Sequence, residues 1–364
     1  MKILHIHTKM VSGGIEAIIC GLANEMAKLQ DVTVCTIFKP TETDVFYERL
    51  IPSVKKLNCG KEKFGFSIKE IFKVYQLIRK HEYEVVHIHG CFQYYFLSVL
   101  LLHRKVKFFY TIHSDATMEN LNTTSIFRGF KAFCFRKGWM KAVTISPESK
   151  KSFTDLYHCD SQLISNGVPM TTPNANNPTV AKYRFTSQTK VFVHPGRISE
   201  AKNQVVLCQA FANLLKQNKD VVLLIAGMPE DTQILAEMEP YFNDRIVYLG
   251  ERKDVIDLLA KADAFCLPSI WEGLPVSLLE ALSVGCVPIC SPVGGIVSVI
   301  KDSENGLLAK SSSLEDYTAA LNRYLDYSDK EIDAFKQRSI ASFAPYNITN
   351  TAKKYIEFYK KTSL

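Results

Sequence analysis

Residues 271–280 read WEGLPVSLLE, a mostly apolar stretch that carries two carboxylates, Glu272 and Glu280. Pro275 is expected as the first residue of a helix that Gly285 ends. Glu272 then lies in the loop before this helix, and Glu280 lies in its second turn. An ionised carboxylate accepts several hydrogen bonds and can bind two neighbouring hydroxyl groups. The two glutamates can therefore hold a sugar and a ribose, with phosphates between them on the amides of the turn.

A simpler interpretation of the two glutamates is also open. A glutamate at the start of a helix is favoured by the helix dipole, and a second one can face solvent. This accounts for Glu272 but not for Glu280, which stands in the apolar row SLLEAL.

Strand and helix patterns alternate along the whole chain. The short β-rich runs of the first half are KILHIHT, VTVCTIF, EVVHIHG and KFFYTIH, and those of the second half include KVFVHPG, VVLLIAG, DAFCLPS and VPICSPV. Such alternation with helical segments is typical of parallel sheets that helices cover on both faces. The sequence therefore predicts an α/β protein of two Rossmann-like domains that face a central cleft.

The expected domain boundaries follow from a change in composition. We expect an N-terminal domain at residues 1–170, a linker at 171–188 and a C-terminal domain at 189–345. The linker is rich in Pro, Asn and Thr and has no apolar period. A last helical pattern within residues 346–364 is expected to pack back on the N-terminal domain.

Composition narrows the class of partner. The 364 residues carry a formal net charge of +7, which suits phosphate-bearing ligands or an anionic membrane surface. No nucleic-acid-binding motif appears, so no nucleic acid is expected as a partner. No apolar run reaches the ~20 residues of a membrane span, and the N-terminus has no signal-peptide pattern. The ten cysteines form no C-x-x-C pair and are expected as reduced core residues of a cytoplasmic protein.

Two further strand-to-helix turns carry residue types that bind phosphates. Gly13 and Gly14 follow the first strand, although such a pair can also be a plain tight connection. The dinucleotide pattern G-x-G-x-x-G is absent and the second strand ends at Lys39, which argues against a dehydrogenase. Arg197 and Lys202 follow the first strand of the second domain, where they suit a diphosphate or are simply solvated cations.

The chain resembles the retaining glycosyltransferases of family four, GT-B enzymes that use nucleotide-sugar donors. The resemblance rests on the glutamate pair within WEGLPVSLLEALSVGCVPICSPVGG and on shorter motifs in the same order. These are SGGIEA at 12–17, TIHS at 111–114, TISPESK at 144–150, SNGV at 165–168, GRISEAKN at 196–203, DAFCLPS at 263–269 and ENGLLA at 304–309. It implies retaining transfer of a sugar from a UDP- or GDP-linked donor to a glycan or lipid-linked glycan, in surface polysaccharide biosynthesis.

The resemblance also assigns roles to residues. It implies that Arg197 and Lys202 bind the donor diphosphate, that Glu272 holds sugar hydroxyls with the amides of Gly273 and Leu274, and that Glu280 holds the ribose. His113 is expected near the reacting centre, as a catalytic residue alongside Glu272, and either a base or a binding role is open for it. Gly13 and Gly14 are expected to border the donor from the acceptor side of the cleft. Leu274 and Pro275 stand where many members have Phe-Gly, which leaves the donor sugar open.

Neither a cofactor nor a metal is expected. No D-x-D triplet occurs in the chain, the arrangement that in other sugar transferases holds a divalent ion on the diphosphate. Arg197, Lys202 and the helix amides would supply that charge instead. The alternating histidines of the predicted strands are expected to be structural; they are His5, His7, His87 and His89.

Two segments are candidates for contact with a membrane. One arc of helix 68–81 is expected to hold Ile68, Ile71, Phe72, Val74, Tyr75 and Ile78, and the other Lys69, Lys73 and Lys80. This helix packs on its own sheet or lies on anionic lipid, and packing is favoured because each helix of this fold needs an apolar face. Segment 126–141 has five basic residues and no acidic one. Peripheral placement on the inner face of the cell membrane is the resulting hypothesis.

Two other classes of function are compatible with the same motifs. One is a catalytically silent protein that binds a nucleotide sugar. The other is a different GT-B enzyme, such as a sugar-nucleotide epimerase. Release of nucleoside diphosphate from the donor and the anomeric configuration of the product separate them from a retaining transferase.

Overall fold

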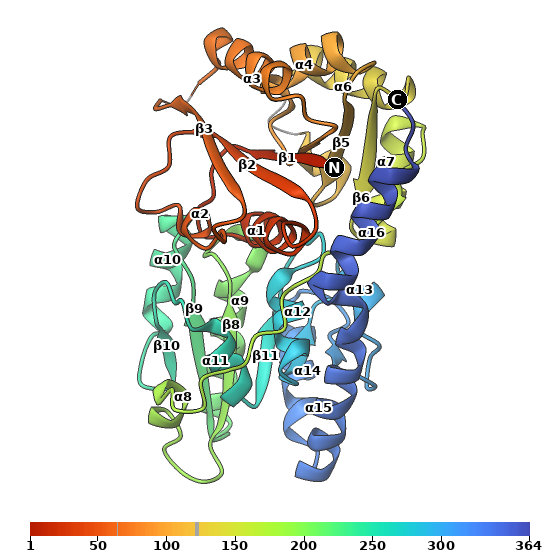
Figure 1. Cartoon of the computed structure of the whole chain (residues 1–364). Helices are drawn as coiled ribbons and strands as arrows, with labels where there is room; N and C mark the ends of the chain where they lie inside the picture. The colour runs from red at the N-terminus through yellow and green to blue at the C-terminus, as the bar shows by residue number, and fades with distance from the viewer. Residues whose placement is uncertain (64, 121–123) are drawn as a thin grey trace. The chain divides into compact units, whose positions relative to one another are not determined.

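The computed structural model describes residues 1–63, 65–120 and 124–364. They form two compact units: unit 1 is Met1–Pro169 with Tyr346–Leu364, and unit 2 is Met170–Pro345. Among the described residues every strand pair of both sheets is parallel. The predicted α/β class with two Rossmann-like domains is confirmed, and Figure 1 shows the elements of each unit.

Unit 1 is built on a seven-stranded sheet in the order β3-β2-β1-β4-β5-β6-β7. Its strands are β1 (Lys2–His7), β2 (Asp31–Phe38), β3 (Lys55–Lys61), β4 (Val85–Ile88), β5 (Lys107–Ile112), β6 (Met140–Thr144) and β7 (Gln162–Leu163). Its helices are α1 (Gly14–Met26), α2 (Val45–Glu48), α3 (Ile68–His81), η1 (Phe92–Tyr94), α4 (Phe96–Leu102), α5 (Ala116–Glu119), α6 (Ser125–Arg136), α7 (Pro147–Tyr157) and α16 (Ile348–Lys361).

Unit 2 is built on a six-stranded sheet in the order β10-β9-β8-β11-β12-β13. Its strands are β8 (Lys190–Pro195), β9 (Val221–Ala226), β10 (Ile246–Tyr248), β11 (Ala264–Leu267), β12 (Val287–Cys290) and β13 (Leu307–Leu308). Its helices are α8 (Thr179–Lys182), η2 (Glu200–Lys202), α9 (Gln204–Lys216), α10 (Thr232–Met238), η3 (Glu239–Tyr241), α11 (Val255–Lys261), α12 (Val276–Ser283), α13 (Ile296–Val299), α14 (Leu314–Leu325), α15 (Asp329–Phe343) and η4 (Ala344–Tyr346), the last at the boundary between the units.

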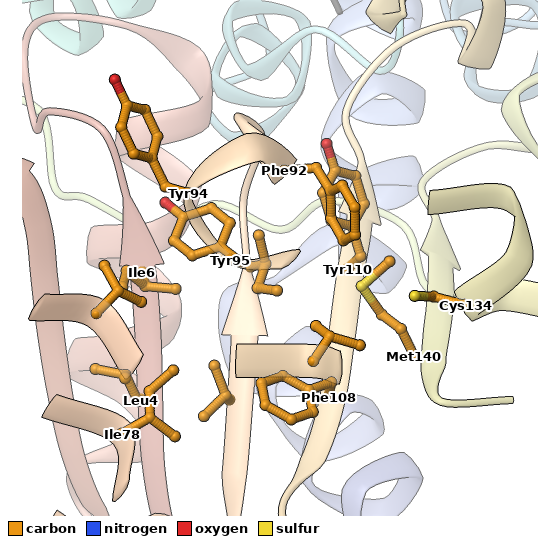
Figure 2. Packing of buried hydrophobic residues seen from close by; sticks show 14 of the residues in the cluster. Leu4, Ile6, Ile78, Phe92, Tyr94, Tyr95, Phe108, Tyr110, Cys134 and Met140 are labelled. Carbon is orange, nitrogen blue, oxygen red and sulfur yellow. The ribbon is translucent and has the colours of Figure 1, made fainter. Parts of the chain in front are cut away.

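One face of the unit 1 sheet carries the apolar core. Leu4 and Ile6 alternate with histidines along β1, so that apolar and imidazole side chains leave opposite faces of the strand. The two apolar side chains belong to one buried cluster with Ile78 of α3 and with Phe108 and Tyr110 of β5 (Figure 2). Helices α3, α4, α6 and α7 also contribute members to this cluster and therefore cover this face.

The opposite face of the unit 1 sheet is polar at its centre and is covered by α16. The buried His87 ring hydrogen-bonds through Nδ1 to the Tyr359 hydroxyl of α16 and through Nε2 to the Thr111 hydroxyl at 2.7 Å. Gly167 lets α16 approach closely, because a Cβ added there would lie 3.0 Å from Cα of Ile348. The C-terminal helix thus completes the N-terminal sheet, and the hydrogen bonds give the histidine a structural role.

Three histidines of this face lie close enough to raise the question of a metal site, because His5, His87 and His89 each place one ligand atom within 4.8 Å of the others. A zinc site needs ring nitrogens that converge on one point at ~2.0–2.1 Å. Here the three rings instead stack, with centroids 4.3–5.4 Å apart. Both nitrogens of His87 also have hydrogen-bond partners. The geometry fits a hydrogen-bonded stack of neutral rings better than a metal centre.

The segment 171–188, expected as a linker, is bonded to unit 2. The side-chain amide of Asn177 donates to Asp254 and Asp257, at 2.6 and 3.1 Å. Lys261 Nζ donates to the carbonyl oxygen of Asn177 at 2.6 Å. These contacts anchor the segment along α11, and part of it forms α8.

Helix α3 differs from its expected pattern. Ile71, Val74 and Ile78 are buried, whereas Ile68 and Phe72, expected on the same packed arc, are more than half exposed. Lys73, expected on the solvated arc, donates to the carbonyl oxygen of Cys59 at 2.7 Å. The apolar arc of this helix is wider than the strip that the sheet covers, so its edge stays exposed.

No helix in the described part of the chain is both long enough and apolar enough to cross a membrane.

Because several imidazoles are buried in their neutral form, we expect the free energy of unfolding to fall in acid. Burial lowers the pKa of His5 to about 4 and that of His87 and His89 well below the usual range; burial and the charge of His7 lower the pKa of His113 to about 3. These folded-state pKa values lie below the unfolded value of ~6.5, so their contribution is complete above pH ~6.5 and is lost as pH falls. For each pH unit below ~6.5, each such histidine lowers the free energy of unfolding by up to about 1.4 kcal/mol.

Urea unfolding followed at pH 7, 6 and 5 measures this effect. The unfolding free energy should fall at each step, and more steeply from pH 6 to 5. An unfolding free energy that stays constant from pH 7 to pH 5 would contradict the buried, neutral state of these rings.

Candidate active site

The order of strands in unit 2 marks one place where a ligand is expected. From β8 the chain proceeds through β9 and β10 toward one edge, and β11, β12 and β13 then lie on the other side of β8. In open parallel sheets ligands bind beside the carboxyl ends of the strands, at the point where the strand order reverses. In unit 2 this point lies between the loops that follow β8 and β11.

Lys202 and Glu272 meet between these two loops. Lys202 Nζ donates to Glu272 Oε1 at 2.6 Å, and the same oxygen accepts a hydrogen bond from the Ser269 hydroxyl at 2.7 Å. The two charged side chains are only 20% and 10% exposed. An ammonium has three N–H donors, so Lys202 can bind a phosphate oxygen while it holds the carboxylate. The geometry thus brings a cation and a carboxylate together, two of the residues expected to act on one donor.

Buried polar groups hold the loop that carries Lys202. The Gln204 side-chain amide donates to the carbonyl oxygen of Arg197 at 2.8 Å, beside His194. Asn203 has a positive φ of 57° and donates to the carbonyl oxygens of Pro268 and Ser312. The loop after β8 is therefore fixed to the loop after β11 through Asn203, which fixes the distance between Lys202 and Glu272.

A glycine pair after β12 supports the backbone of Glu272. A Cβ added to Gly294 would lie 1.9 Å from the carbonyl oxygen of Glu272, and φ at Gly294 is +51°. Gly295 N donates to the carbonyl oxygen of Gly273 at 2.6 Å. Only a residue without a side chain fits against this turn, so Gly294 sets the position of the loop that presents Glu272.

The helix α12 begins one residue later than expected. Pro275 is its N-cap, with φ −69° and ψ 128°, and Val276 is the first helical residue. The helix ends as expected before Gly285, which has a φ of +74°. Glu280 lies in the second turn and is partly exposed, whereas Leu274 is buried. The turn that contains Gly273 and Leu274 precedes the helix, which is the predicted arrangement.

Arg197 lies apart from the Lys202–Glu272 pair. Its Nη1 donates to Glu230 Oε1 at 3.2 Å, and both side chains are about half exposed. Exposed ion pairs of this kind contribute little, ~0–1 kcal/mol, and exchange partners readily. The structure thus places Arg197 on the same loop as Lys202 but directs it to a surface partner.

In the sheet of unit 1 the strand order reverses between β1 and β4, so a ligand is expected beside the carboxyl ends of these two strands. The helix α1 begins at Gly14, and Gly13 is its N-cap. A Cβ added to Gly13 would lie 2.3 Å from Glu16 Oε2. The other carboxylate oxygen of Glu16 lies 3.4 Å from His7 Nε2. The Gly13–Gly14 turn therefore leaves room for a carboxylate beside the end of β1.

His113 directly follows β5 and is anchored from two sides. Its Nε2 lies 3.0 Å from Nδ1 of His89, and its backbone N–H donates to Glu119 Oε2 at 3.2 Å. Glu119 also accepts a hydrogen bond from the Tyr110 hydroxyl at 2.5 Å. Burial raises the pKa of the Glu119 carboxyl, and the nearby Lys131 opposes this shift. The position of His113 thus depends on a partly buried carboxyl that sequence reasoning missed.

Comparison with known proteins identifies the family. The model of the glycosyl transferases group 1 matches residues 177–340, and that of Glycosyltransferase Family 4 matches residues 12–171. The chain belongs to the family-four glycosyltransferases.

Relatives of this glycosyltransferase are distant. It is 25% identical over 274 residues to UDP-Gal:alpha-D-GlcNAc-diphosphoundecaprenol alpha-1,3-galactosyltransferase of Escherichia coli. This alignment covers 71% of this chain and 70% of the relative. It is 29% identical over 150 residues to N,N'-diacetylbacillosaminyl-diphospho-undecaprenol alpha-1,3-N-acetylgalactosaminyltransferase of Campylobacter jejuni. That second alignment spans 41% of this chain and only 39% of the relative.

A solved structure shares the fold of the glycosyltransferase over its whole length. Anabaena Alr3699/HepE, crystallised with UDP and glucose, has a TM-score of 0.80 at 18% identity, with 100% of both chains covered. The likeness shows the GT-B fold.

Several residues that position the candidate site were not singled out from the sequence. Gln204 and Asn203 stand in the run EAKNQ, where a buried amide after a charged loop gives no distinctive local pattern. Gly294 and Gly295 stand in SPVGG directly after a predicted strand, and that position could have marked them as a close backbone approach. Glu119 gave no signal, because its partners come from β5 and the loop after it.

A substitution of Gly294 tests whether this glycine positions Glu272. Gly294→Ala should lower the rate of glycosyl transfer at least about tenfold, because the new Cβ displaces the Glu272 backbone. Gly250→Ala is the matched control, since Gly250 also has a positive φ, +68°, but no atom lies within 4 Å of its added Cβ. Both variants share the cost of a left-handed alanine, ~1–2 kcal/mol.

Thermal unfolding and steady-state kinetics of the two variants decide the matter. Loss of turnover in folded Gly294→Ala, with turnover kept in Gly250→Ala, supports the role of the glycine pair. Equal turnover in the two variants would show that Gly294 only shapes a turn.

Proposed function

We propose that this glycosyltransferase moves a sugar from a UDP- or GDP-linked donor to a glycan or lipid-linked glycan acceptor, with retention of anomeric configuration and without a metal ion. The observation that carries the proposal is the contact of Lys202 with Glu272 between the loops after β8 and β11. A nucleotide sugar needs a cation at its diphosphate and hydrogen-bond acceptors at its sugar, and the bond that breaks lies between the two. The pair supplies both within 2.6 Å of each other.

The proposed division of roles follows from charge. Lys202, assisted by the amides of Gly273 and Leu274, stabilises the negative charge that develops on the leaving diphosphate. Glu272 binds sugar hydroxyls, and its carboxylate lies where positive charge develops on the sugar ring. Glu280, farther along the same segment in α12, binds the ribose. Arg197 leaves its exposed partner Glu230 for the diphosphate when the donor binds.

Metal independence is proposed from the residues that are present. The chain has no D-x-D triplet, and the position next to Glu272 is already occupied by an ammonium group. Electrostatic stabilisation of a leaving group by fixed cations and amides is usually the largest single term in catalysis. Lys202 can therefore provide at the diphosphate the charge that a divalent ion provides elsewhere.

A lipid-linked acceptor is proposed from the relatives. The two bacterial relatives described above are named for acceptors that carry diphosphoundecaprenol. An acceptor with a polyprenyl chain is held in a membrane, so the protein must reach the membrane surface. We therefore propose that the reaction belongs to surface polysaccharide biosynthesis and takes place on the inner face of the cell membrane, on the side where nucleotide sugars are made.

The outer surface of α3, α4 and α6 fits such a membrane contact, and we refer to it as the three-helix surface. Its apolar side chains that are more than half exposed are Phe66, Ile68, Phe72, Leu101 and Ile126. The ring of Phe66 packs on Phe127 of α6, and Phe127 packs on Phe96 of α4. These ring contacts link the helices that Figure 1 shows side by side on unit 1.

The charge of the three-helix surface suits anionic lipid. Exposed basic residues on and beside these helices are Lys63, Lys69, Arg79, Lys80, Arg104, Lys105, Arg128, Arg136 and Lys137. The single acidic residue within the three helices, Glu70, is buried, and the exposed acidic residues that flank α3 are Glu62 and Glu82. Apolar side chains that enter the lipid, surrounded by lysines and arginines that meet phosphate head groups, are typical of interfacial binding.

The test of the activity is transfer to a soluble, short-chain prenyl-diphosphate sugar. With the matching nucleotide sugar, the protein should release nucleoside diphosphate in excess EDTA, and the product should keep the anomeric configuration of the donor by NMR. Glu272→Gln is the control: it should still bind the nucleoside diphosphate, while kcat falls by about a hundredfold.

Each competing function predicts a different result. A silent binder would bind the donor without releasing diphosphate, and an epimerase would interconvert the donor sugar without acceptor. An inverted product would overturn retention. Activity that is lost in EDTA and restored by Mn²⁺ would overturn metal independence.

The membrane contact predicts that exposed apolar side chains drive binding to vesicles. The combined variant Ile68→Ser, Phe72→Ser and Ile126→Ser should bind vesicles of anionic lipid at least about a hundredfold more weakly, since each such side chain contributes ~1.5–3 kcal/mol when it enters lipid. Leu29→Ser is the control, because Leu29 is 82% exposed but lies after α1.

Vesicle co-sedimentation at low and high salt measures this binding. The wild-type protein and Leu29→Ser should both bind, and more weakly at high salt. Wild-type protein that does not bind anionic vesicles at low salt, or a triple variant that binds as the wild type does, would rule out the three-helix surface as the docking site.

A further inference from the structure

Three histidines of unit 1 form a continuous chain of ring nitrogens that ends at His113. His5 Nδ1 lies 3.1 Å from His89 Nε2, and His89 Nδ1 lies 3.0 Å from His113 Nε2. His5 and His89 are fully buried, whereas His113 is partly exposed. Both nitrogens of His89 are therefore used, one toward each neighbour. We refer to these residues as the histidine chain.

The histidine chain can carry its protons in only two ways. A neutral imidazole has one N–H donor and one bare acceptor nitrogen. Since His89 faces a ring nitrogen on each side, its tautomer dictates that of both neighbours. Either all three rings are protonated on Nδ1, or all three are protonated on Nε2. The rings are neutral at pH 7, because burial lowers the pKa of His5 to about 4, that of His89 well below its usual range and, together with the nearby His7, that of His113 to about 3.

The buried end of the chain favours one of these two arrangements. Nε2 of His5 is buried and has no hydrogen-bond partner in the part of the chain that the structure describes. If the rings were protonated on Nε2, this position would be a buried N–H without an acceptor, which is the rarer kind of unsatisfied group in proteins. Protonation on Nδ1 leaves only a bare nitrogen there.

The groups around the chain are compatible with this choice. The His7 ring contacts the carbonyl oxygen of His89 through Nδ1 and faces Glu16 through Nε2, so it donates outside the chain. His87 stacks on His5 and His89, but its nitrogens face Thr111 and Tyr359. Glu119 contacts the backbone N–H of His113 and not its ring. None of these contacts supplies a partner for Nε2 of His5.

We infer that the histidine chain holds His113 as the Nδ1–H tautomer, so that His113 offers a substrate a hydrogen-bond donor and not a general base. Its Nε2 accepts the proton of His89 Nδ1, and Nδ1, on the opposite side of the ring, carries the remaining proton. A donor at this position suits an oxygen of a bound substrate, either a hydroxyl or a phosphate oxygen. His89 and His5 are then positioning residues. The substrate part of the inference rests on the proposed function, whereas the tautomer does not.

The tautomer can be measured in the free protein by NMR. In protein labelled with ¹⁵N-histidine, long-range ¹H–¹⁵N correlation distinguishes a protonated ring nitrogen from a bare one, and the signals that vanish in His113→Gln are those of His113. At pH 7 we expect Nδ1 of His113 to be protonated and Nε2 to be bare. Protonation on Nε2, or on both nitrogens, would overturn the inference, whatever the protein does with a nucleotide sugar.

Variants of His89 test the positioning role. His89→Asn keeps a side-chain N–H near the place of Nδ1 and should preserve the His113 tautomer and most of the turnover. His89→Leu removes this donor, so His113 should become a mixture of tautomers and kcat should fall about tenfold. Equal kcat and an equal His113 spectrum in the two variants would overturn the positioning role.

A variant at the buried end and a control complete the test. His5→Phe removes the donor to His89 and should change the NMR signals of His113, although the two residues lie two strands apart. This second variant tests the inference even if His89→Leu does not fold. His103→Gln should leave the His113 signals unchanged, because the His103 ring stacks on Trp139 outside the chain. An unchanged His113 spectrum in folded His5→Phe would show that His5 does not set the tautomer.

Discussion

The ion pair of Lys202 with Glu272 depends on the parallel arrangement of the unit 2 sheet. All strands of a parallel sheet end at the same edge, so the loops after β8 and β11 meet although 70 residues separate the two side chains. The strand order reverses between these two strands, and in open parallel sheets this is where ligands bind. The pair then holds its charges with 20% and 10% exposure, where each charge requires a partner. Lys202 therefore gives Glu272 the partner that allows a carboxylate at this site.

Close backbone contacts fix the loops that carry these charges. Asn203 ties the loop of Lys202 to the loop after β11, and Gly294 lets the loop after β12 touch the backbone of Glu272. Gly227 acts in the same way after β9, since a Cβ there would lie 1.8 Å from the carbonyl oxygen of Gly196. Neighbouring loops thus support one another at the carboxyl edge, and the site charges are placed by backbone contacts more than by their own helices.

Unit 1 uses the two faces of its sheet differently. Leu4 and Ile6 enter an apolar core beneath α3, α4 and α6, while His5 enters a polar layer beneath α16. Burial keeps the imidazoles of this layer neutral, and neutral rings can pass hydrogen bonds from one to the next. The helices of the apolar face also have an outer side. Because the sheet covers only part of each helix, exposed apolar residues such as Phe72 remain there for contact with lipid.

Local sequence patterns determined the architecture of this protein and the places where its loops could bind a ligand. Alternation of apolar and polar residues predicted the parallel sheets, and Gly285 marked the end of α12. The spacing of Glu272 and Glu280 put them before the helix and in its second turn, because both positions depend only on neighbours along the chain. The one-residue error at Pro275 is of the same local kind, since a proline fits both the N-cap and the first turn.

Only the tertiary structure decided which of these residues meet. It joined Lys202 to Glu272, directed Arg197 to Glu230, placed Gly294 against the Glu272 backbone and linked His5 through His89 to His113. It also showed that Ile68 and Phe72 are exposed, although the apolar periodicity of their helix predicted that both are buried. Periodicity reports the face on which a side chain lies, but not which strand is its neighbour or how far the sheet extends beneath a helix. Those depend on strand order and on contacts between residues distant in sequence, and such contacts leave no local pattern.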